Sequence, residues 1–80
     1  MPRYFFHLFN DMTAFDEEGQ ELPNDAVALE RAKVSARAMA AESVCQGHLV
    51  LRHRIEVQNE RGVTVGMIHF RDVVAVDSSA

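Results

Sequence analysis

The side chains that could do chemistry are four histidines, one cysteine and a group of acidic residues. His7 and His69 could lie on adjacent strands, and Cys45 and His48 have a three-residue spacing found in metal sites. Zinc sites, however, usually have at least three well-spaced ligands, and the chain has no second cysteine. The sequence therefore predicts scattered surface or edge histidines, with no metal site and no cofactor.

The acidic residues gather between Asp11 and Asp25, where no basic residue occurs. This segment lacks the alternating ligand register of a calcium loop. Asp16-Glu17-Glu18-Gly19 instead predicts a type I turn, with Asp at its first position and Gly at its last. We interpret the segment as a solvated turn whose acids also complement the dipole of a following helix.

The candidate nucleophiles are Cys45, Ser35 and Ser43, and all three fall in a predicted helix without a recognisable base-bearing motif. A buried thiol is usually a small apolar residue. The four glycines are isolated, so there is no phosphate-binding loop. We therefore predict no catalytic residue and no enzymatic activity.

One long helix, 24–47, carries the three candidate nucleophiles. Asn24 or Asp25 can cap its start, and Gly47 supplies a left-handed stop. The residues between them are mostly good helix formers. An apolar stripe of mainly small side chains predicts close packing against a sheet. Its members are Leu29, Ala32, Ala36, Met39, Ala40 and Ser43.

A second stripe runs along nearly the opposite side of this helix: Val27, Val34, Ala38, Ala41 and Cys45. An ordinary surface helix has one apolar stripe and one polar face. Two interpretations stay open. Either another molecule covers the second stripe, or the alanines are helix filler and two valines are simply exposed.

Three strands are predicted around the helix, at 3–9, 54–59 and 63–70, and Asn59 to Gly62 forms a hairpin loop. The order β-α-β-β predicts an α+β fold: a two-layer domain in which one helix crosses one face of a small antiparallel sheet. We expect the first and third strands to be neighbours. Segment 12–15 is either a short strand or loop, and 73–76 is either strand or turn.

The alternation of side chains assigns each strand residue to a face. The helix is expected to cover Tyr4, Phe6, Leu8, Ile55, Val57, Val63 and Val65. Phe5, His7, Phe9, Ile68 and Phe70 are then left on the open face. An apolar patch of this kind typically marks a partner surface.

Length and charge limit the function classes. The 80 residues form a single domain, 1–80, with a frayed tail at 77–80. The net charge of −4 argues against nucleic acid as the main partner. The lone cysteine fits a reducing compartment. No apolar run is long enough to span a membrane and no signal peptide pattern is present, so we expect a cytoplasmic protein.

Two N-terminal motifs carry a resemblance: Pro2-Arg3-Tyr4-Phe5-Phe6-His7-Leu8 and Asp16-Glu17-Glu18-Gly19-Gln20-Glu21-Leu22-Pro23. With the Ala-rich helix and the strand Arg54-Ile55-Glu56-Val57, they resemble a family of short bacterial proteins known only as a domain of unknown function. The resemblance implies no activity or catalytic residue. More distantly, the strand–acidic turn–helix order is similar to small antitoxin-like domains.

The first hypothesis is a small non-catalytic interaction module that forms a homo-oligomer, expected to be a dimer. Its surface would be the open sheet face, with Phe5, His7, Phe9, Ile68 and Phe70, or the outer helix stripe, with Val27 and Val34. The other surface could take an unidentified protein partner. The alternative is a regulatory nucleic-acid-binding or antitoxin-like domain. Its exposed aromatic rings would stack on bases, with Arg52 and Arg54 near phosphates.

Overall fold

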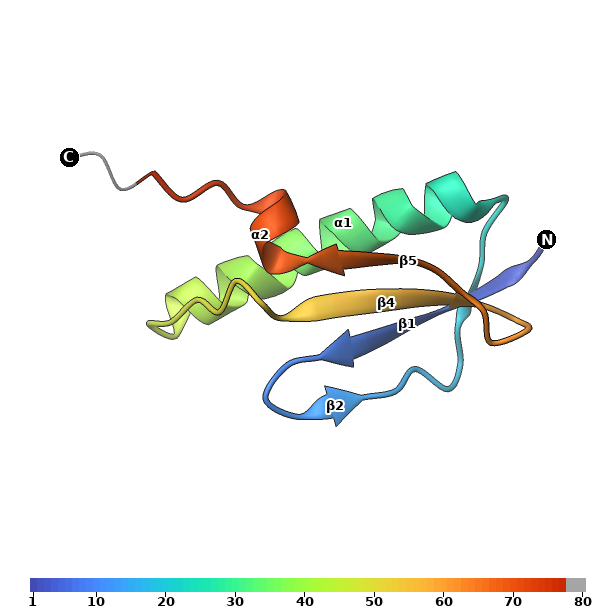
Figure 1. Cartoon of the computed structure of the whole chain (residues 1–80), viewed down its shortest axis with the longest axis horizontal. Helices are drawn as coiled ribbons and strands as arrows, with labels where there is room; N and C mark the ends of the chain where they lie inside the picture. Colours follow the sequence, from blue (N-terminus) through green and yellow to red (C-terminus); the bar gives the residue numbers. More distant parts are fainter. Residues whose placement is uncertain (78–80) are drawn as a thin grey trace.

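The computed structural model describes residues 1–77 (Figure 1). The predicted frayed tail, 77–80, lies outside the described residues except for Asp77. The elements are β1 (Arg3–Phe9), β2 (Thr13–Ala14), β3 (Gln20–Glu21), α1 (Asp25–Cys45), β4 (Arg54–Asn59), β5 (Thr64–His69) and α2 (Phe70–Val73). Among residues 1–77, no helix is both long and apolar enough to cross a bilayer. The structure decides between the alternatives that the sequence left for two segments. Segment 12–15 contains the short strand β2, and Val73 is the last residue of the short helix α2.

The predicted α+β architecture of two layers is confirmed. The antiparallel sheet has the order β2-β1-β4-β5, and β3 pairs with β1 beside β2. Helix α1 packs on one face of this sheet, mainly against β4 and β5, while no helix of the described residues covers the other face (Figure 1).

The predicted strand order is wrong: β1 pairs with β4, and β5 lies at the margin of the sheet. The reason is the short return made by β2 and β3, both antiparallel to β1. This return brings the chain back to the start of β1, so α1 runs in the same direction as β1 (Figure 1). The chain then leaves α1 near the end of β1, and β4 can pair directly with β1 in the antiparallel sense.

Local signals set both ends of α1 as predicted. The Asn24 Oδ1 accepts a hydrogen bond of 2.9 Å from the Val27 N–H, and Gly47 follows the helix with a φ of 92°. The face turned to the sheet is a ladder of alanines four residues apart, all at most 1% exposed: Ala28, Ala32, Ala36 and Ala40. Met39, predicted on this stripe, is 37% exposed. The small side chains let the helix approach the sheet closely.

Gly66 lies where helix α1 closely approaches the sheet, and it marks an irregular pairing. A Cβ at this position would overlap the Leu29 side chain. The register shifts between Val57 and Gln58, because Val57 pairs with Gly66 but Gln58 pairs with Thr64. This β-bulge places one extra β5 residue opposite β4, so the alternation of faces changes by one residue along β5.

The prediction that Ile68 and Phe70 lie on the open face is therefore wrong. Ile68 pairs with Ile55, faces the helix and is 7% exposed. Phe70 is 2% exposed because it begins α2, donates its N–H to the His53 carbonyl at 2.8 Å and packs in the core. Val63, expected in the core, is 55% exposed.

Candidate interaction surfaces

The outer edge of β1 is closed by backbone pairing and by one carboxylate. Leu8 pairs with Ala14 of β2, and Tyr4 pairs with Gln20 of β3. Between these strands the Asp16 Oδ2 accepts a hydrogen bond of 3.1 Å from the Phe6 N–H. The acidic segment therefore works as an interrupted edge strand, with the Asp16 side chain bridging the interruption.

The same carboxylate closes the predicted turn. The Asp16 Oδ1 accepts hydrogen bonds of 3.1 Å from the N–H groups of both Glu18 and Gly19. Burial alone would raise the pKa of Asp16, but the N–H donors of Gly19, Phe6 and Glu18, with nearby His7, outweigh it and lower the pKa. The ionised form of Asp16 is thus part of the folded edge.

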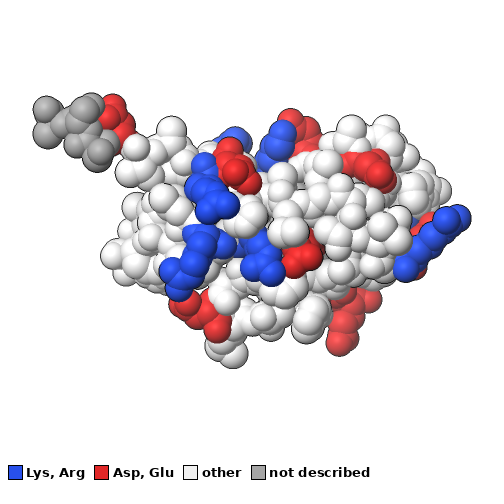
Figure 2. Space-filling model, viewed as in Figure 1, with Lys and Arg blue, Asp and Glu red and all other residues white. Residues whose placement is uncertain are grey.

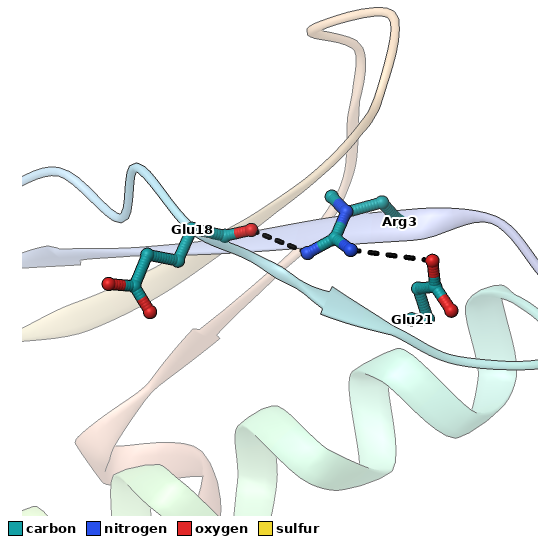
Figure 3. A network of polar contacts seen from close by, with 3 residues as sticks. All are labelled: Arg3, Glu18 and Glu21. Carbon is teal, nitrogen blue, oxygen red and sulfur yellow. Dashed lines mark hydrogen bonds and ion pairs between the residues drawn. The ribbon is translucent and has the colours of Figure 1, made fainter.

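The side chain of Arg3, on β1, also contacts β3 and the loop before it (Figure 3). Its Nη1 donates to the Glu18 carbonyl at 2.6 Å, and its Nη2 lies 3.3 Å from the Glu21 Oε1. The ion pair itself is exposed and contributes little. The bond to the Glu18 carbonyl adds a second restraint on the loop that Asp16 organises.

His7 is held beneath the acidic loop and is 9% exposed. Its Nδ1 accepts a hydrogen bond of 3.0 Å from the Asp16 N–H, so the neutral ring carries its proton on Nε2, which lies 3.2 Å from the Gln58 Oε1. The Phe15 ring lies edge-on to it, with 5.3 Å between ring centroids. His7 therefore supports the loop and is not a free contact residue of the open face.

The open face has an aromatic row along β1 and a polar row along β4. Phe5 and Phe9 are half-buried, whereas Phe15 is 67% exposed and lies 6.1 Å from the Phe9 ring. On β4, Arg54 and Glu56 form an ion pair of 3.1 Å, and the Arg54 guanidinium lies 4.3 Å from the Phe9 ring centroid. This face is consequently less apolar than predicted, and its most exposed ring, Phe15, was missed.

Basic side chains gather at one end of this face, around α2 and the start of β4 (Figure 2). Arg71 donates its backbone N–H to the Leu51 carbonyl at 3.2 Å, which brings Arg71 next to Arg52. Both arginines are exposed, and Arg54, two residues after Arg52, lies on the open face over the Phe9 ring. The basic cluster is thus Arg52, Arg54 and Arg71.

The outer edge of β5 is left open. Within residues 1–77, no strand pairs with it on that side. The segment 63–70 has no Asp, Glu, Lys or Arg, and Met67 on β5 is 47% exposed. An unpaired, uncharged edge is a ready template for another strand. Sequence reasoning missed this surface because it placed the third strand beside the first; the uncharged run was the available signal.

The second helix stripe is exposed in the single chain, which is consistent with both of its interpretations. Val27 is 37% and Val34 58% exposed, and Ala38, Ala41 and Cys45 are also exposed. Among residues 1–77 of one chain, no element covers the stripe.

Residues 3–71 match the model of a family described as a domain of unknown function, DUF6894. The chain belongs to this family. The match runs from β1 into α2 and so includes both sheet edges, and it confirms the expectation that the chain belongs to a family known as a domain of unknown function. No match was found among curated proteins or among solved structures.

In this DUF6894 domain the histidines do not converge. His7 and His69 lie on β1 and β5, which β4 separates, so their predicted adjacency is wrong. Among residues 1–77, no group of three or more His, Cys, Asp or Glu side chains could hold a metal ion. His53 packs edge-on against Phe70 at 5.6 Å, and its buried Nε2 lies 3.6 Å from the Asp11 carboxylate.

Proposed function

We propose that this DUF6894 domain is a small non-catalytic interaction module that self-associates, with two copies joined edge to edge along β5. The observation that carries the proposal is the unequal treatment of the two sheet edges. The β1 edge has two strand pairings and the Asp16 carboxylate, whereas within residues 1–77 the outer edge of the six-residue strand β5 has no paired strand and β5 has no Asp, Glu, Lys or Arg. Natural domains usually blunt an edge that is meant to stay unpaired.

An antiparallel pair of β5 strands would be symmetric, since each copy offers the same surface to the other. With the two-fold axis between Gly66 and Met67, Thr64 of one copy lies opposite His69 of the other. Glu60 and Arg61 precede the strand, while Arg71 and Asp72 follow it. Antiparallel alignment would therefore bring opposite charges together at both ends of this β5–β5 interface (the β5 joint), with Arg61 of one copy near Asp72 of the other.

The expected strength is modest. A six-residue strand pair adds about six backbone hydrogen bonds, each contributing about 0.5–1.5 kcal/mol net. Association costs about 4–15 kcal/mol in lost freedom. Burial of the exposed parts of Val63 and Met67 adds to the favourable side. We therefore expect a dimer that dissociates on dilution.

The test is solution mass by light scattering across a dilution series. Met67→Lys places a like charge on both copies at the joint and should give a monomer. Met12→Lys is the matched control, because Met12 is 81% exposed beside the closed β1 edge. A wild type that is monomeric at every concentration contradicts self-association. A Met67→Lys dimer contradicts the β5 joint, and Phe15→Asp and Val34→Asp then test the open face and the helix stripe.

Regulatory binding of single-stranded nucleic acid is a second candidate function. The basic cluster favours it, because Arg52, Arg54 and Arg71 lie at the end of the face where Phe9 and Phe15 are available for stacking. Phe70 is buried and cannot take the stacking role predicted for it. Anisotropy of a labelled oligonucleotide at low salt should fall for Arg52→Glu but not for Arg61→Glu in the distant hairpin. Absence of binding at low salt contradicts this candidate.

A further inference from the structure

A cavity of about 300 Å³ opens beside the second half of α1, and none of its lining residues lies on β1 or β5. Its lining comes from α1, the segment after α1 and the residue that follows α2. The lining residues are Arg37, Ala40, Ala41, Val44, Leu49 and Val74. The volume is at the lower end of the range for small-molecule sites.

Small side chains leave this space unfilled. Ala40 and Ala41 stand where larger residues would reach toward Leu49 and Val74. The space is a depression open to solvent, since Ala41 and Val44 in its lining are exposed. All residues of the lining except Arg37 are apolar, so the space suits a hydrocarbon chain better than water.

Arg37 is the single charged group of the lining. Its Nε donates to the Val73 carbonyl at 3.3 Å, which holds the guanidinium at the cavity beside the end of α2. A guanidinium has five N–H donors, and this hydrogen bond uses one of them, so four N–H groups of Arg37 are not used by it. Among the described residues, no carboxylate lines the cavity. The rim is therefore positive and the floor is apolar.

We propose that this cavity binds a free medium-chain carboxylate. Its alkyl chain would lie against Ala41, Val44 and Leu49, and its carboxylate would accept two parallel hydrogen bonds from Arg37. The volume suits one short chain, which argues against a two-chain lipid. No residue of β5 lines this site, so the ligand-binding proposal and the β5 self-association proposal can fail separately.

The test compares octanoate with octanol, which has the same chain length without the charge. Both are titrated below micelle formation into the ¹⁵N-labelled full chain, and amide shifts are followed. We expect saturable shifts at Ala41, Val44, Leu49 and Val74, with octanoate binding about tenfold more tightly than octanol. Arg37→Gln should remove that preference. Arg31→Gln, a control on the same helix outside the cavity, should keep it.

Ala41→Phe should abolish binding of both ligands by filling the space, and its exposed position makes the change compatible with folding. Three results would overturn the proposal: no saturable shift in the wild type, shifts confined to the open sheet face, or an octanoate preference that survives in Arg37→Gln.

Discussion

At the scale of single residues, Asp16 and Gly19 decide how the edge of β1 is closed. Asp16 accepts three backbone hydrogen bonds, and Gly19 lets the loop pass close to β1. The sequence identified the turn from the Asp and Gly positions. It could not reveal the contact between Asp16 and Phe6, because that contact joins residues whose pairing depends on the fold.

Asp16→Asn should lower the free energy of unfolding by about 1–3 kcal/mol at pH 7, because charge-assisted hydrogen bonds are lost. The lowered pKa of Asp16 sets the pH dependence. A carboxyl whose pKa is lower in the folded state stabilises the fold above its unfolded pKa, and this contribution disappears as pH falls through the folded pKa. In urea unfolding, the difference between wild type and variant should therefore shrink below about pH 4.

Glu17→Gln is the control for this pH experiment, since Glu17 is an exposed carboxylate in the same loop and, among the described residues, accepts no backbone hydrogen bond of this kind. A difference between wild type and Asp16→Asn that stays constant down to the acid range would contradict the role assigned to the ionised carboxylate.

Gly19→Ala should destabilise the domain more than Gly62→Ala. Both glycines have a left-handed φ, of 70° and 77°, which costs a non-glycine residue about 1–2 kcal/mol. Only Gly19 is also crowded: a Cβ there would lie 2.8 Å from the Tyr4 carbonyl oxygen, while nothing lies within 4 Å at Gly62. Thermal unfolding of the two variants checks this, and equal losses would show that the crowding does not matter.

At the scale of elements, the helix was predictable and the strand order was not. Asn24 and Gly47 define the ends of α1 through local signals, and the four-residue spacing of alanines predicts its buried face. In contrast, β2 and β3 are each two residues long, too short to carry a pattern. Because these two strands could not be predicted, the reversal of the chain direction before α1 could not be predicted either. The bulge opposite Val57 likewise arises from strand pairing, so Ile68 was assigned to the wrong face.

The alanine ladder makes a prediction at this scale. Ala36→Leu should destabilise the domain by about 1–3 kcal/mol. Ala36 is fully buried on the face of α1 that packs against the sheet, so a larger side chain would overpack the contact between helix and sheet. Ala38→Leu, two residues away on the exposed stripe, should change the unfolding midpoint little. Equal tolerance of both substitutions in urea unfolding would contradict close packing of the helix on the sheet.

At the scale of the whole molecule, a small two-layer domain leaves much surface uncovered. The two edges of its sheet also differ: β2 and β3 pair with the β1 edge, whereas within residues 1–77 no strand pairs with the outer edge of β5. A chain of this size buries only about 60% of its unfolded surface, so an additional strand pairing is a substantial gain. The sequence anticipated an uncovered apolar surface from its aromatic residues. It did not identify β5, because the surface depends on which strand ends the sheet.

Hydrogen exchange as a function of protein concentration tests the β5 joint most directly. Backbone amides of 64–69 that point outward from the sheet should exchange slowly at high concentration and quickly on dilution, whereas amides of β4 should be unaffected. In Met67→Lys, these outward-pointing amides of β5 should exchange quickly at every concentration. If protection of β5 does not change with concentration while the solution mass does, two copies meet through another surface and the edge-to-edge account is wrong.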